Sequence, residues 1–254
     1  MTPHKDKSIE VKSPGEIAIM RKAGKILKDV LDNLVSLVSP GMTTWDFEFK
    51  ARRLFQEKGV KPAFLGYMNY PAVLCTSINE EVVHGIPSKR RILKNGDLLK
   101  IDAGLLYKGF YADSARTVPV GDVNDESHLL IEVTKKALWN GIGEARAGKR
   151  LGDISYAIQT AAETVGFSVV REYTGHGIGR SLHEPPQIPN FGNPNRGPRL
   201  KTGMVFAIEP MVNAGGWETR VLKDNWTVVT ADGRRSAHFE HTIAITKDSP
   251  EIFT

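Results

Sequence analysis

A repeated spacing of glycine and aspartate is the feature of this sequence that most constrains its fold. The matched residues, each pair 107 positions apart, are Gly41 and Gly148, Asp46 and Asp153, and Gly59 and Gly166. In each copy, a helix pattern precedes the first glycine, a second helix pattern follows it, and strand-like sequence comes after the second glycine. Chance matching of common turn residues is the alternative. We interpret the spacing as an internal duplication that gives two α+β halves.

The helix signals have clear starts and stops. Ser13-Pro14-Gly15-Glu16 is a capping box with proline at the first helical position, and it predicts a helix to about Val38. Three further helices are expected, over about 43–59, 125–145 and 153–166. No linker-like tract separates the halves, so we expect a flexible arm over 1–12 and a single domain over 13–254. The repeat halves would run over about 13–122 and 123–250.

A hairpin is predicted over 98–118, where two apolar runs flank Lys108-Gly109. With these two residues as the loop, Gly104 faces Asp113, and Asp102 lies two residues further along the same face. The two carboxylates are then diagonal neighbours, with β-carbons about 7–8 Å apart. They would repel each other unless protonated or bridged by cations. The alternative is that one Asp ends a strand and the other faces water.

The second half is expected to be rich in strands. Runs at 167–170, 204–210, 226–229 and 242–245 fit strands, as does 72–78 in the first half. Proline-rich loops, including Glu184–Pro198, are expected between them. Glu209 closes one of these runs and Glu240 leads into another, and a carboxylate there is costly to bury without a cation or hydrogen bonds. A solvent-facing charge on a strand is the alternative for each.

A histidine among glycines is a third candidate ligand. His176 lies in Thr174-Gly175-His176-Gly177-Ile178-Gly179, which lacks the acidic partner of a dinucleotide fingerprint. Together, Asp102, Asp113, His176, Glu209 and Glu240 suit divalent manganese, iron, cobalt or zinc. Metals held this way could activate water for hydrolysis of a carbonyl or a phosphoryl centre. Spacing alone does not choose between these two reactions.

Composition excludes several other classes. Cys75 is the single cysteine, which excludes an internal disulfide framework and a cysteine-based zinc site. Residues 1–13 show no apolar signal segment and no apolar run reaches 18 residues, so we expect a cytoplasmic protein with no membrane partner. The formal net charge is +5, and Lys89-Arg90-Arg91 is the densest basic cluster. This excess permits association with the ribosome, although a solvated surface is the simpler interpretation.

Five separated motifs then resemble the type I methionine aminopeptidases, in their bacterial-like form, which belong to subfamily A of peptidase family M24. The motifs, in family order over about residues 9–250, are Ser77–Pro87, Ile101-Asp102 with Asp113, Thr174–Gly179, Phe206–Pro210 and Phe239–Thr242. The resemblance implies the pita-bread fold, an α+β fold with a pseudo-twofold repeat and an antiparallel sheet covered by helices. It implies removal of the initiator methionine from nascent polypeptides whose second residue is small.

The resemblance also implies residue roles. Asp102 would bind one of two divalent ions, Asp113 and Glu240 would bridge both, and His176 and Glu209 would bind the other. A metal-bound hydroxide would attack the methionine carbonyl, with Glu209 as general base. His183 would stabilise the oxyanion, and His84 would contact the amide nitrogen beside the scissile bond.

The methionine side chain would enter a pocket of aromatic and apolar residues. Its expected lining is Phe64, Tyr67, Tyr70, Cys75, Leu182 and Trp226. Phe64 stands where the family often has Cys, and Leu182 where it often has Phe, so the pocket shape departs from the family pattern. Asn79 and Ser236 fall where some members hold a monovalent cation.

Three alternatives remain beside this interpretation. They are a pita-bread peptidase acting on Xaa-Pro peptides, a metal-free binding protein of the same fold, and a metal-dependent phosphatase. Relatives that only bind lose ligands, whereas this chain keeps all five. No coiled coil or large apolar repeat is evident, so a monomer is expected.

Overall fold

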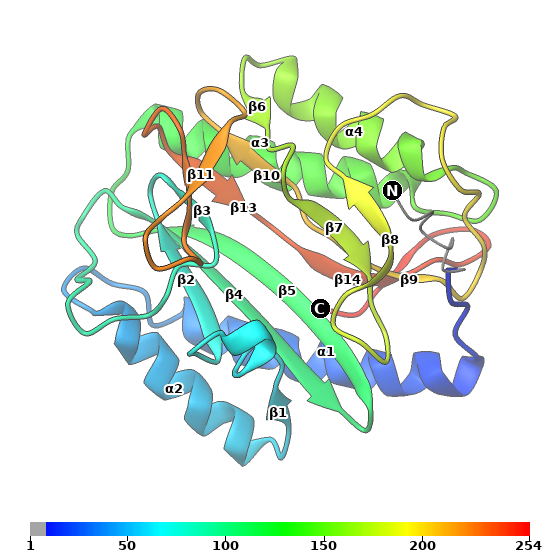
Figure 1. Cartoon of the computed structure of the whole chain (residues 1–254), viewed down its shortest axis with the longest axis horizontal. Coiled ribbons are helices and arrows are strands. Elements are labelled where there is room, and N and C mark those ends of the chain that lie inside the picture. Colours follow the sequence, from blue (N-terminus) through cyan, green and yellow to red (C-terminus); the bar gives the residue numbers. More distant parts are fainter. Residues whose placement is uncertain (1–8) are drawn as a thin grey trace.

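The computed structural model describes residues 9–254 as helices packed with antiparallel strands (Figure 1). The helices are α1 (Pro14–Val35), α2 (Thr44–Glu57), α3 (Asp125–Glu144) and α4 (Leu151–Glu163), with a 3-10 turn at Tyr67–Asn69. The strands of the first half are β1 (Lys61–Pro62), β2 (Leu74–Ile78), β3 (Glu81–Val83), β4 (Leu98–Tyr107) and β5 (Phe110–Pro119). Those of the second half are β6 (Ser168–Val169), β7 (Thr174–Gly177), β8 (Glu184–Pro189), β9 (Val205–Ile208), β10 (Met211–Asn213), β11 (Thr219–Val221), β12 (Val228–Thr230), β13 (Ser236–His238), β14 (His241–Ala244) and β15 (Glu251–Ile252).

Helix α1 begins as predicted and ends earlier than predicted. The backbone N–H of Ser13 donates to Glu16 Oε2 at 2.8 Å, which completes the expected capping box. The helix ends at Val35, not near Val38, because the N–H groups of Leu37 and Val38 bond only three residues back. This tight turn leads the chain into Pro40 and Gly41.

The 107-residue repeat is present in the backbone. Gly41 and Gly148 have φ angles of +90° and +92°, which glycine adopts at little cost. Their N–H groups donate to the carbonyls of Leu93 and Leu200, which are themselves 107 residues apart. The turn that precedes the second helix of each half is therefore built in the same way.

The second helices of the two halves also start alike. Asp46 Oδ2 accepts the backbone N–H of Thr43, and Asp153 Oδ2 accepts that of Arg150, at 2.7 and 2.8 Å. Each half has its own apolar core, one around Leu27, Phe47 and Leu99 and the other around Leu138, Ile154 and Phe206. In Figure 1 the pair α1 and α2 and the pair α3 and α4 lie at opposite ends of the view, with the long strands between them.

The strands of the two halves meet along β5 and β14. Thr242 Oγ1 accepts the N–H of Asp113 at 2.9 Å and donates to its carbonyl at 2.7 Å. The Ser114 hydroxyl donates to the carbonyl of Glu240 at 2.8 Å. These buried bonds hold the first-half hairpin against the second-half strands, so residues from both halves face one another there.

Two segments differ from the sequence predictions. Glu184–Pro189, expected within a proline-rich loop, is the strand β8. It pairs only with β7 at the edge of its sheet, and an edge strand is where proline is tolerated in a sheet. Residues 1–8 of the expected arm lie outside the described residues, whereas Lys12 is buried and its Nζ lies 2.7 Å from Glu184 Oε2. Among residues 9–254, no helix is both long and apolar enough to cross a membrane.

Candidate metal centre

The β4–β5 hairpin has the predicted register. Gly104 pairs with Asp113 and Asp102 with Ala115, across a turn in which Lys108 and Gly109 have φ angles of +49° and +84°. Asp102 and Asp113 therefore lie on one face, as predicted. That face looks toward the second half of the chain.

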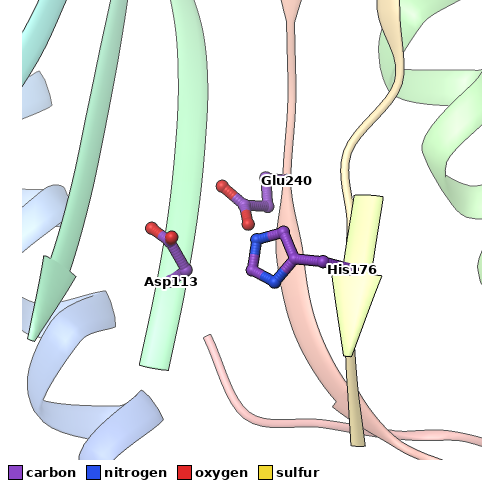
Figure 2. Close-up of side chains that lie close together, drawn as sticks. All are labelled: Asp113, His176 and Glu240. Atoms are coloured by element: carbon purple, nitrogen blue, oxygen red, sulfur yellow. The ribbon is translucent and has the colours of Figure 1, made fainter. Parts of the chain in front are cut away.

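Three candidate ligands from both halves converge. Single ligand atoms of Asp113, His176 and Glu240 lie within 4.8 Å of one another, and all three residues are buried. Figure 2 shows these side chains pointing toward one another from β5, β7 and the segment just before β14. The backbone N–H of Glu240 donates to the carbonyl of Ala115 at 3.0 Å, which fixes that segment beside the hairpin.

Glu209 and Asp102 complete the cluster. Glu209 follows β9 directly, and its Oε1 lies 3.6 Å from His176 Nε2. Asp102 lines the same cavity of about 320 Å³ as the other four residues. Asp102 and Glu209 are 107 residues apart, so each repeat contributes one carboxylate at the equivalent position.

Burial and mutual repulsion shift the pKa values of these groups strongly. Burial raises the pKa of Asp102 to about 7 and that of Glu209 to about 8. Burial, followed by the charge of its neighbour Asp102, raises the pKa of Asp113 well above its usual range. Burial and the charge of Asp113 do the same to the pKa of Glu240. Four acids packed this closely need protons or cations to coexist.

The donor set fits divalent cations. Asp102 Oδ1 and Glu240 Oε1 are buried without a hydrogen-bond partner, although buried acceptors are normally satisfied. Burial lowers the pKa of His176 to about 3, which leaves a neutral imidazole able to coordinate. Carboxylate oxygens with one imidazole are typical ligands of manganese, iron, cobalt or zinc.

His183 and His84 line the same cavity as the cluster. The His183 ring centroid lies 4.3 Å from that of His176, and its Nδ1 lies 2.8 Å from the hydroxyl of Tyr67. His84 has a φ of +62° and lies edge-on to Tyr173 and Trp226. Burial lowers the pKa of His84 to about 4, so its ring is neutral at physiological pH.

The predicted methionine pocket opens onto the same cavity. The cavity lining includes all six residues that the sequence predicted for the pocket: Phe64, Tyr67, Tyr70, Cys75, Leu182 and Trp226. The Tyr70 hydroxyl has the carbonyls of Leu74 and Gly85 within hydrogen-bonding distance, at 2.9 and 3.1 Å, and can donate its one proton to either. Its ring meets that of Trp226 edge-on, with centroids 4.9 Å apart. The cavity is therefore lined by both apolar and acidic side chains.

Sequence reasoning missed several cavity residues. Met68, Val83, Tyr173, Thr174 and Met211 also line it. His238 Nε2 lies 3.4 Å from Glu209 Oε2 and is buried without a hydrogen bond. His238 stands two residues before Glu240, so strand alternation could have placed it on the same side.

The expected monovalent-cation position is occupied by the chain itself. The carbonyls of Asn79 and Ser236 both accept hydrogen bonds from Lys100 Nζ, at 2.7 and 2.9 Å. These residues therefore do not fit an additional cation between the two carbonyls. Burial lowers the pKa of Lys100 to about 7.

Comparisons with known proteins agree with this architecture. The model of metallopeptidase family M24 matches residues 18–247. The chain is 51% identical to methionine aminopeptidase 1 of Bacillus subtilis over 243 residues, covering 96% of this chain and 98% of that protein. It is 47% identical to the methionine aminopeptidase of Clostridium acetobutylicum over 246 residues, covering 97% and 98%.

Solved structures give the same result. The methionine aminopeptidase of Thermotoga maritima superposes with a TM-score of 0.96 at 48% identity, covering 97% of this chain and 99% of that one. A prolidase from Pyrococcus furiosus, at 23% identity and a TM-score of 0.78, shares the fold over 65% of its own length. These neighbours confirm the predicted pita-bread fold.

Proposed function

The chain belongs to metallopeptidase family M24, and we propose that it removes the initiator methionine from nascent polypeptides whose second residue is small. The observation that carries this proposal is one cavity holding both the carboxylate–histidine cluster and the apolar pocket. If the thioether side chain of a substrate methionine lay among the apolar lining residues, the carbonyl of that methionine could lie near the cluster.

Five residues would hold two divalent ions. Asp102 would bind one ion, His176 and Glu209 the other, and Asp113 and Glu240 would bridge them. The convergence of Asp113, His176 and Glu240 and the unpartnered oxygens of Asp102 and Glu240 support this assignment. Bound divalent ions supply Lewis acidity and lower the pKa of water. Cobalt, manganese, iron and zinc all suit this donor set.

The protein's own groups would handle protons and developing charge. Glu209 would accept the proton of the attacking water, a role open to a carboxylate that lies directly beside the proposed ions. His183 would donate to the oxyanion at the cavity mouth. His84, held neutral by burial, would contact the amide nitrogen next to the scissile bond.

The preference for a small second residue fits the position proposed here for the scissile bond. That bond would lie between the acidic cluster and the ring of His183, which stands 4.3 Å from that of His176. A long side chain after methionine would meet these rings. Ribosome association, a monomeric state and a cytoplasmic location stay predictions from the sequence.

A tripeptide panel tests the proposal. Purified protein with Co²⁺ or Mn²⁺ should release methionine from Met-Ala-Ser and not from Met-Lys-Ser. Ala-Pro-Ser serves as the Xaa-Pro comparison, and a phosphate monoester as the phosphatase comparison. No methionine release with any divalent metal, or equal cleavage of Ala-Pro-Ser, would contradict the proposal.

A further inference from the structure

Lys100 is a buried lysine that belongs neither to the metal cluster nor to the substrate pocket. It is 1% exposed and lies on β4, two residues before Asp102. Its Nζ donates to the carbonyl of Asn79 at 2.7 Å and to that of Ser236, 136 residues away in sequence, at 2.9 Å. The ammonium therefore connects three segments of the chain.

Hydrogen bonds that do not involve Lys100 hold the backbone around the two carbonyls. Asn79 has a φ of +52°, its Oδ1 accepts the N–H of Leu98, and its Nδ2 donates to Asp97 Oδ1 at 2.8 Å. Ser236 donates its N–H to the Asn79 carbonyl at 3.0 Å and its hydroxyl to the carbonyl of Val212 at 3.1 Å. The position of both carbonyls is thus fixed by contacts that do not involve Lys100.

Converging backbone carbonyls are also the ligands that proteins offer to potassium and sodium. A lysine ammonium is a compact point charge with three donors, so it can meet the same oxygens without leaving the chain. We propose that the Lys100 ammonium is a built-in replacement for a monovalent cation between Asn79 and Ser236, so that this protein binds neither K⁺ nor Na⁺ there.

Lys100 at this position joins segments from the two halves of the fold. The Asn79 turn joins β2 to β3, and Ser236 opens β13, which precedes Glu240 by two residues. Lys100 thereby ties the first-half sheet to the segment that carries a candidate ligand of the second half. The covalently attached Lys100 Nζ donates to both carbonyls whatever the salt composition.

Thermal unfolding in exchanged salts tests the proposal without reference to catalysis. The melting temperature of the unaltered protein should be the same in KCl, NaCl and choline chloride at equal ionic strength. Lys100→Ser should melt lower in choline chloride, and K⁺ or Na⁺ should raise its melting temperature saturably. Lys100→Met should also melt lower without that specific rise, because its side chain still fills the space. Lys136→Ala, at an exposed helix position, is the control.

A crystallographic measurement needs no variant. Crystals of the unaltered protein soaked in Rb⁺ or Tl⁺ should show no anomalous peak between the carbonyls of Asn79 and Ser236. A peak within coordination distance of both would overturn the proposal. So would a folded Lys100→Ser protein whose melting temperature does not distinguish K⁺ and Na⁺ from choline. Neither result would bear on methionine release, which the tripeptide panel tests separately.

Discussion

The hydroxyl of Tyr67 lies 2.8 Å from Nδ1 of His183, and the two rings are 5.3 Å apart between centroids. When the hydroxyl donates to Nδ1, the neutral imidazole carries its proton on Nε2. That tautomer is the one that can donate to an oxyanion. Tyr67 thus links the methionine pocket to the proposed oxyanion donor.

Tyr67→Phe should lower kcat while leaving KM for Met-Ala-Ser little changed, because the ring that lines the pocket remains. The loss should be smaller than the roughly 100-fold or greater loss expected for His183→Ala, which removes the donor itself. Steady-state kinetics on both variants check this. Tyr156→Phe, on an exposed face of α4, is the control. An unchanged kcat for Tyr67→Phe would remove the positioning role.

Asp113→Ala should abolish retention of divalent metal and with it methionine release, because Asp113 is proposed to contact both ions. Metal analysis after gel filtration and the tripeptide assay measure the two effects. Asp29→Ala, which removes an exposed carboxylate on α1, should retain metal and activity. Full activity in Asp113→Ala would exclude the bridging role.

Leu182→Ala should widen the methionine pocket, since Leu182 is only 3% exposed and lines the cavity. The change should favour the S-ethyl homologue over methionine in X-Ala-Ser substrates by about 10-fold or more in the ratio of kcat/KM, the range for one methylene in an apolar pocket. Leu129→Ala, at an exposed position of α3, should leave that ratio unchanged. A ratio unaltered by Leu182→Ala would place the methionine side chain elsewhere.

Asp153→Ala should cost about 1–2 kcal/mol of stability at neutral pH, because its carboxylate accepts the N–H groups of Arg150 and Asn195. Burial opposes ionisation of this group, but those two bonds bring its pKa below the usual range. A carboxylate whose pKa is lower in the folded than in the unfolded protein stabilises the fold at pH values above the unfolded pKa of about 4. That stabilisation is lost as the pH falls through the lowered folded-state pKa. The difference from the unaltered protein should therefore shrink toward pH 3 in urea titrations. Asp153→Asn, which keeps one acceptor, should lose less; a pH-independent difference would contradict the account.

Local sequence patterns predicted most of the helices and the central hairpin. The Lys108-Gly109 turn set the hairpin register, and the glycines at 41 and 148 marked equivalent turns because both need a left-handed backbone. The end of α1 was less predictable, since nothing before Pro40 forbids another helical turn. The strand β8 was missed because Pro185 and Pro186 argue against a strand except at an edge, and edges are set by tertiary structure.

The site was harder to assemble from sequence. Local features singled out Asp102 and Asp113, but only the meeting of β5 with β14 brings His176 and Glu240 beside them. His238 and Lys100 escaped notice because their partners lie far away in sequence. The equivalence of Asp102 and Glu209 was visible in the numbering, since the repeat spacing of 107 relates them.

The most direct test of the central claim is a metal titration of chelator-stripped protein, with bound Co²⁺ or Mn²⁺ and methionine release from Met-Ala-Ser followed together. We predict no release without metal, release that grows with bound metal, and binding that saturates at two ions per chain. Full methionine release by the stripped protein in excess chelator, or saturated metal binding with no release, would contradict the account.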